Sequence, residues 1–206
     1  MFPVGRGAAL GLVAYVLGYI VTYVLVQLST DETSLELTFA LTDISKFDIV
    51  GWMFYNTHFV SVTASAESAG RTESESTNML AEASDLVLPE PFWYLVPILL
   101  LILAGFIVAM TISQSNQTGK AVSAGATVFV GYFPLSIVGL FLFGSSIEFP
   151  SFGQTATITV GPDKLMGILF AGIVFPIVFG MIGGLLASLV STGGSTGSRS
   201  GVSRHS

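Results

Sequence analysis

The chain has 206 residues and no cysteine, with 51% apolar residues, only 10% charged residues and a formal net charge of −6. Soluble domains carry roughly a quarter charged residues, so this composition indicates an integral membrane protein. The lack of cysteine excludes a disulfide framework, a cysteine-ligated zinc or iron–sulfur site and a thiol nucleophile.

Four stretches are long and apolar enough for a transmembrane helix, which needs about 20 mostly apolar residues. None of them contains an Asp, Glu, Lys, Arg or His. Each is expected to be helical, because a helix satisfies its own backbone hydrogen bonds in lipid and a lone strand does not. The predicted spans are residues 7–28, 92–112, 121–143 and 165–190.

Residues 1–28 form the N-terminal end and the first span. The apolar run after Arg6 is about twice the length of a signal-peptide core, which favours a retained anchor. Gly7 and Gly11 form a small-xxx-small pair in this span, and Gly180 and Gly184 form another in the fourth. Such pairs let helices approach closely, so these four glycines are predicted to pack helix on helix within the bundle.

Residues 29–91 form an acidic region that contains a predicted amphipathic helix at about 43–59. Asp43 is the expected N-cap, and residues 44, 47, 51, 54 and 58 lie along one helical face. Trp52, Tyr55 and His58 carry amphipathic rings that suit the headgroup layer. We therefore predict a helix lying on the outer leaflet, with these three residues as a candidate exterior interface.

Residues 49–64 are apolar enough to be considered as a fifth span, but the stretch is short and has Asn56, Thr57 and His58 near its middle. A span here would also move the acidic stretch that follows into the cytoplasm, against the preference of Lys and Arg for that side. The sequence therefore favours the interfacial helix.

Alternating apolar and polar residues predict short strands at residues 35–41 and 155–160, and Val60 and Val62 suggest a third. The second of these strands belongs to an exterior loop over residues 144–164. The Ser- and Glu-rich stretch 65–84 and the Gly/Ser-rich tail 191–206 have compositions typical of mobile or disordered chain.

The charges set the predicted orientation. Taking the spans in order, one side carries only basic residues, which places the N-terminus, the loop 113–120 and the C-terminal tail in the cytoplasm. All 13 acidic residues fall on the other side. The expected fold is an all-α membrane protein of the cell membrane, a bundle of four transmembrane helices with a small exterior cap of one interfacial helix and short strands.

Three segments resemble an uncharacterised family of multi-spanning membrane proteins from halophilic archaea. They are GRGAALGLVAYVLGYIVTY at residues 5–23, VGWMFYNTHFV at 50–60 and GYFPLSIVG at 131–139. The resemblance implies a membrane location and a multi-span architecture, and it carries no functional residues. The acidic exterior is in keeping with a high-salt organism.

The sequence offers little chemistry. Asp43, Asp48 and His58 are the only group that resembles a clustered site, and we predict no catalytic residue, cofactor or metal and no nucleic-acid partner. The expected partners are the lipid bilayer and either another protein or a second copy of the chain. The predicted function is a non-enzymatic membrane scaffold or accessory protein.

The alternative function is a small permease or channel subunit. Each of the last two spans contains a Phe-Pro pair, at Pro134 and Pro176, with glycines on both sides. Proline removes a backbone donor and opens a helical turn, and interrupted helices in corresponding positions can mark a substrate pathway. Ordinary kinking in a packed bundle is the simpler explanation of both prolines.

Overall fold

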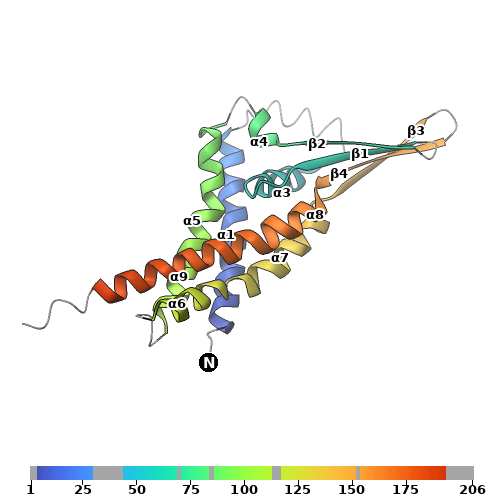
Figure 1. Ribbon diagram of the computed structural model, residues 1–206. Coiled ribbons are helices and arrows are strands. Elements are labelled where there is room, and N and C mark those ends of the chain that lie inside the picture. The colour runs from blue at the N-terminus through green and yellow to red at the C-terminus, as the bar shows by residue number, and fades with distance from the viewer. Residues whose placement is uncertain are drawn as a thin grey trace, which may run out of the picture.

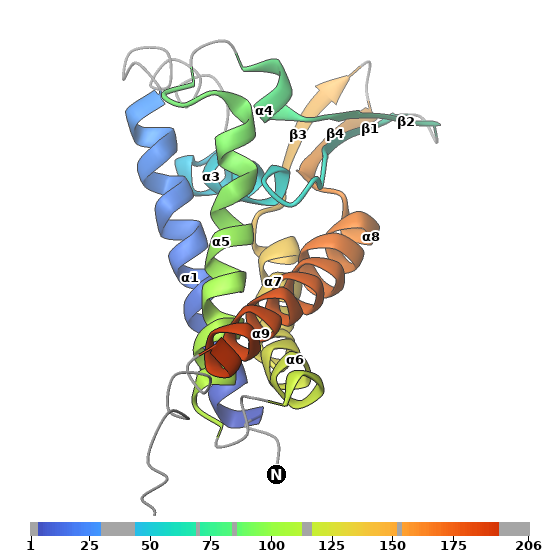
Figure 2. The same ribbon diagram turned by 60° about the vertical axis from the view of Figure 1, so that its left-hand side comes forward.

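In the described part of the chain, four helical segments are long and apolar enough to cross a membrane, and they dominate the structure. Helices α1 (Val4–Ser29) and α5 (Glu90–Met110) run side by side, and the later helices cross them at a steep angle (Figures 1 and 2). The computed structural model describes residues 4–29, 44–68, 71–83, 86–112, 117–151 and 154–193.

The third apolar segment is divided into α6 (Thr118–Ala126) and α7 (Phe129–Leu142). The N–H groups of Val130 and Gly131 bond carbonyls only three residues back, so the chain tightens just before Pro134. Pro134 has no N–H, and its ring crowds the carbonyl four residues back, that of Val130, directly after this tightened turn. The span predicted over 121–143 is thus one apolar helical segment, Thr118–Leu142, with a tightened turn inside it.

The fourth segment is irregular beside its proline as well. It begins with α8 (Lys164–Met166), continues as the π-helix η1 (Gly167–Val174) and ends as α9 (Phe175–Gly193). The N–H of Phe175 donates to the carbonyl of Phe170, five residues back. The π geometry ends at Val174 and α9 begins at Phe175, so the change lies directly beside Pro176, which has no N–H to donate.

Glycines set how closely the first helix approaches the third segment. A methyl group built at Gly7 would lie less than 3.0 Å from Thr127, and one at Gly11 would lie less than 3.0 Å from the carbonyl of Val128. Both neighbours belong to the turn between α6 and α7. The predicted pair on α1 therefore lies at a helix crossing where no side chain larger than hydrogen fits.

The pair on α9 lies at an equally close crossing with α6. A methyl group at Gly180 would lie 2.6 Å from the carbonyl oxygen of Gly125, and one at Gly184 would overlap the carbonyl of Ala121. Gly105 of α5 meets the backbone of Gly180 from the other side. Backbone-to-backbone contact through small residues thus joins α5, α6 and α9.

Helix α3 (Lys46–Asn56) is shorter than the predicted helix at 43–59 and begins with a different cap. Ser45 is the N-cap: its hydroxyl accepts from the N–H of Asp48, and the Asp48 carboxylate accepts from the N–H of Ser45. This capping box satisfies two backbone donors at the start of the helix and fixes where it begins. Asp43, the expected cap, and the predicted strand at 35–41 lie outside the described residues.

Helix α3 is also a core element, which corrects the predicted interfacial helix. Every residue from Val50 to Asn56 is buried. Gly51 leaves room for the ring of Phe143, and the indole N–H of Trp52 donates to the Phe143 carbonyl at 2.6 Å. From Val50 onward the helix is therefore covered by the chain itself, whereas Phe47 in its first turn is 44% exposed.

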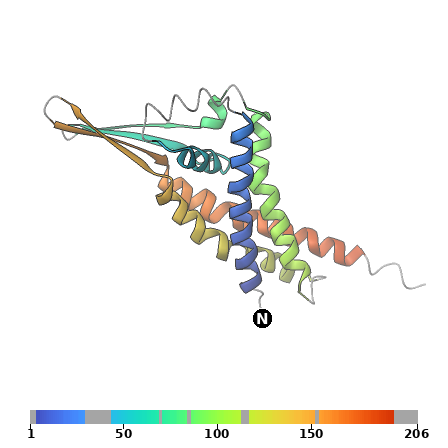
Figure 3. The same cartoon turned by 180° about the vertical axis from the view of Figure 1, so that it is seen from behind.

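The strands within the described residues form one antiparallel sheet of four, in the order β2-β1-β4-β3. It projects sideways beyond the helices, as the views from the front and from behind both show (Figures 1 and 3). Strands β1 and β4 are central, and Ala64 of β1 lies opposite Val160 of β4. The strands are β1 (Val62–Ser68), β2 (Arg71–Thr77), β3 (Ser145–Ser151) and β4 (Gln154–Pro162).

Residues 65–84, predicted to be mobile, contain ordered structure. Most of β1, all of β2 and the short helix α4 (Met79–Glu82) lie in this range. Strand β2 is polar and lacks the alternating apolar pattern that predicts a strand, but its backbone pairs with β1 over seven residues. Ladder hydrogen bonds supplied by a neighbouring strand do not appear in composition, which explains the error.

Candidate functional site

A group of buried polar side chains lies where α1, α3 and α7 meet. Its central member is His58, which is fully buried. The chain leaves α3 through Phe59, whose backbone φ of 59° is in the left-handed region. The N–H of Val60 then bonds back to the carbonyl of Tyr55, which closes a turn that ends the helix.

Both ring nitrogens of His58 have a partner. Nδ1 lies 2.8 Å from the carbonyl oxygen of Phe54, and Nε2 lies 2.6 Å from the hydroxyl of Tyr132. Because a carbonyl can only accept, Nδ1 carries the proton. In the neutral ring Nε2 is then an acceptor, and the Tyr132 hydroxyl donates to it.

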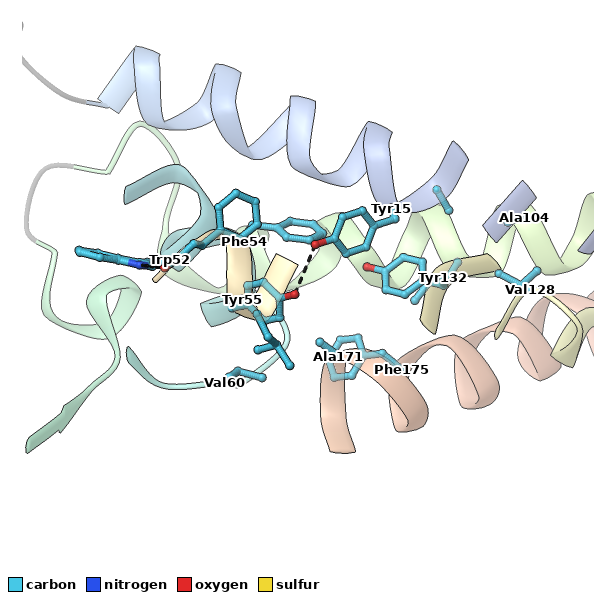
Figure 4. Close-up of a cluster of buried hydrophobic side chains, with 14 of the residues drawn as sticks. Tyr15, Trp52, Phe54, Tyr55, Val60, Ala104, Val128, Tyr132, Ala171 and Phe175 are labelled. Atoms are coloured by element: carbon cyan, nitrogen blue, oxygen red, sulfur yellow. Dashed lines mark hydrogen bonds between the residues drawn. The ribbon is translucent and has the colours of Figure 1, made fainter. Parts of the chain in front are cut away.

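A second pair of hydroxyls extends this group toward α1. The Tyr55 hydroxyl donates to the backbone carbonyl of Ser136, and the hydroxyl of Tyr15 lies 3.3 Å from that of Tyr55. Since the proton of Tyr55 is already used, Tyr15 donates in this contact. Figure 4 shows the Tyr15–Tyr55 contact within the surrounding aromatic side chains. We call Tyr15, Tyr55, His58 and Tyr132 the buried polar cluster.

Burial decides the charge state of His58. Removal from water lowers the pKa of His58 to about 4, because the charged imidazolium loses its hydration. The hydrogen bond to the Phe54 carbonyl acts in the opposite direction and is the weaker effect. Burial likewise raises the pKa of Tyr55 above its ordinary value. The buried polar cluster is therefore uncharged at neutral pH. Its side chains act through hydrogen bonds that hold α1, α3 and α7 together.

The cluster of Asp48 and His58 that an enzyme would need is not assembled. Asp48 bonds to Ser45 at the start of α3, and His58 follows its far end. A helix rises about 1.5 Å per residue, so about 15 Å separates their backbones. Within the described part of the chain, no three His, Cys, Asp or Glu side chains lie close enough to hold a metal ion.

The amino-acid sequence assigns the chain to a protein family. Residues 1–191 match a family described as "Family of unknown function (DUF7978)". The chain belongs to this family of unknown function. No curated protein and no solved structure matches it.

For this DUF7978 member, the structure places the predicted exterior residues inside. Trp52, Tyr55 and His58 are 4%, 0% and 0% exposed, so none presents its ring to a partner or to the headgroup layer. Each uses its polar atom within the chain: Trp52 on the Phe143 carbonyl, Tyr55 on the Ser136 carbonyl and His58 on Tyr132. An amphipathic ring serves an interface or a polar core equally well, which is why the sequence prediction misplaced them.

The partners of these three residues were missed from the sequence. Tyr132 and Ser136 are in the third apolar segment and Tyr15 is in the first, and nothing in the sequence pairs them with α3. The sequence did contain one sign of a polar site: Tyr132 and Ser136 are four residues apart, so they lie on the same face of an apolar helix.

Replacing Tyr132 with phenylalanine tests the buried polar cluster. We expect Tyr132→Phe to lower the free energy of unfolding by about 1–3 kcal/mol, because Nε2 of His58 becomes a buried acceptor without a donor. Tyr23→Phe is the matched control, since Tyr23 is 43% exposed on α1. Denaturation of the detergent-purified protein measures both; equal effects of the two substitutions would count against the cluster.

Proposed function

We propose that this protein is a multi-pass integral membrane protein that acts as a non-enzymatic scaffold or accessory protein, with its projecting sheet as the surface that contacts a partner. Membrane insertion is supported by the apolar side chains that point outward from the helices. Leu99, Val138 and Leu189 are each more than half exposed. A lipid bilayer is the environment that suits apolar surface of this extent.

The charges support an orientation with the sheet outside the cell and the N-terminus in the cytoplasm. The start of α1, which contains Arg6, and helix α6, which contains Lys120, lie at the end of the molecule opposite the sheet (Figure 1). The Arg6 guanidinium donates to the carbonyl of Thr111 at the end of α5. Lys and Arg favour the cytoplasmic side of short loops. The described acidic residues belong to the sheet and to the elements at its end of the molecule, namely α3, α4 and the starts of α5 and α8 (Figure 1). They are Asp48, Glu67, Glu73, Glu75, Glu82, Glu90, Glu148 and Asp163.

The projection of the sheet is the observation that carries the proposal. Val62 at its base is buried against the core, whereas Ala64, Ala66 and the described side chains of β2 from Thr72 to Ser76 are exposed. A platform with a fixed base and exposed faces is suited to contact with another protein. Glutamates in the outer strands β2 and β3 discourage strand-to-strand pairing, so the expected contact uses a face of the sheet.

The permease alternative has less support, because the fourth helical segment packs closely along the third. Gly167 lies against Leu140, and Gly172 lies against Phe133. Further along, Gly180 meets the backbone of Gly125. A pathway lined by Pro134 and Pro176 would have to separate these contacts.

Site-specific photo-crosslinking in native membranes tests the accessory role. A photo-reactive residue at Ser74, exposed on β2, is expected to give a protein adduct. The same residue at Leu103, exposed at 54% on α5, is the control and is expected to give lipid adducts only. An adduct of twice the chain mass would identify a second copy as the partner. Protein adducts absent at Ser74, or found only at Leu103, would overturn the proposal.

A further inference from the structure

A groove of about 490 Å³ lies beneath the base of the sheet. Its sheet side carries four hydroxyls on one face, because side chains alternate along a strand and Ser65 and Ser146 both lie opposite Thr159. The fourth is Thr63. Its other side is formed by Leu140 and Phe141 at the end of α7 and Leu165 at the start of α8. The volume is in the range of ordinary small-molecule sites.

The groove contains a lysine at its edge. Lys164 is exposed, and its Nζ lies 5.4 Å from the centre of the Phe141 ring. Asp163 also lines the groove and keeps its negative charge, and its Oδ1 accepts from the N–H of Met166 at 2.7 Å. Lys164 supplies the positive charge that a ligand in the groove would meet. The hydroxyls of Ser146 and Thr159 lie 3.3 Å apart and share one hydrogen bond, which leaves one of their protons, with that of Ser65, to donate to a ligand.

The apolar side of the groove continues into the outward surface of the helices. Phe141 is 66% exposed and Leu165 is 72% exposed, and Leu142 beside Phe141 is also exposed. A ligand that matches all three parts has an anionic, hydrogen-bonding head and an apolar chain. A free phosphate ion would use the lysine and the hydroxyls but leave Phe141 and Leu165 uncovered.

We propose that this groove binds one phospholipid, with its phosphate between Lys164 and the hydroxyls of Ser65, Ser146 and Thr159 and its acyl chains against Phe141 and Leu165. Lys164 immediately precedes the apolar part of the fourth segment, where a lysine at the membrane surface meets lipid phosphates. The inference rests on the proposed membrane insertion and is independent of any protein partner. A failure of crosslinking at Ser74 would leave it standing.

Native mass spectrometry of the detergent-purified full chain tests the site. Phosphatidylglycerol is expected to saturate at one lipid per chain, and diacylglycerol with the same acyl chains is expected to bind much more weakly. Lys164→Gln should lower the affinity for phosphatidylglycerol roughly tenfold or more, as expected for loss of a charge-assisted contact. Thr159→Val, which removes one hydroxyl, should lower it less.

Lys46→Gln is the matched control, because it removes the other lysine at the sheet end, on α3, and should leave lipid binding unchanged. Unchanged melting temperatures would show that both lysine variants are folded. The proposal is overturned if Lys164→Gln binds phosphatidylglycerol as wild type does, or if diacylglycerol binds equally well. It is also overturned if glycerol phosphate competes as strongly as the lipid, since a soluble anion would then be the ligand.

Discussion

Replacing Gly184 with alanine is expected to destabilise the helical core by about 1–3 kcal/mol, the usual cost of inserting a methyl group into a packed interior. The methyl group would overlap the carbonyl of Ala121 and approach the backbone of Val122. Backbone atoms cannot move aside as a flexible side chain can, so α9 and α6 must separate. Unfolding in mixed detergent measures the loss.

Gly5→Ala is the control for this substitution and should act in the opposite direction. Gly5 lies in α1, and a methyl group there would have no neighbour within 4 Å. Alanine favours a helix over glycine by up to about 1 kcal/mol, so Gly5→Ala should be neutral or slightly stabilising. A similar loss at both positions would show that helix crossings are not the cause.

Acidification is expected to destabilise the protein through His58. Its pKa is about 4 in the folded chain and about 6.5 in a solvated one. Between pH 6.5 and pH 4 the imidazole of His58 is protonated in the unfolded chain and neutral in the folded chain. The free energy of unfolding therefore falls by about 1.4 kcal/mol per pH unit across this window, to a total near 3 kcal/mol. Above pH 6.5 this contribution is constant.

His58→Gln isolates the effect of His58 from the carboxylates that titrate in the same range. The variant should be less stable than wild type at pH 7.5, because glutamine does not reproduce both hydrogen bonds of the ring. Its stability should decline less between pH 6.5 and 4. Chemical denaturation at several pH values gives the two curves. Parallel curves would place the protonation of His58 outside the folding equilibrium.

The helical layer was readable from the sequence because a long apolar run without charge has few alternatives to a helix. The details inside these runs were not readable. The turn at Thr127 and the π-helix before Pro176 depend on whether each N–H bonds the carbonyl three, four or five residues back. A proline indicates that some hydrogen bond is missing but leaves the rearrangement open.

Helix α3 shows a different limit of sequence interpretation. Its apolar pattern correctly indicated a helix, but a pattern does not reveal what covers the apolar residues. Lipid was the expected cover, whereas the structure uses Phe143 and Tyr132, which lie more than 70 residues further along the chain. The location of His58 and Trp52 depended on those distant contacts.

The sheet was partly predictable. Alternation at 155–160 identified part of β4, and Val62 marked the start of β1. Strand β2 was missed because Arg71–Thr77 is polar throughout. The groove beneath the base of the sheet could not be predicted either, since Ser65, Phe141, Thr159 and Lys164 come together only when β1, α7, β4 and α8 assemble.

The pairing of β1 with β4 has a consequence for biogenesis. Val62 lies opposite Pro162, so 100 residues separate the partners, and α5, α6 and α7 intervene. At synthesis rates of about 5–20 residues per second, the hairpin β3–β4 is made roughly 5–20 s after the hairpin β1–β2. With the membrane insertion proposed above, the two hairpins meet only if the intervening segments place them on the same side of the bilayer. Only chains whose segments have inserted with the correct topology can therefore complete the four-stranded sheet.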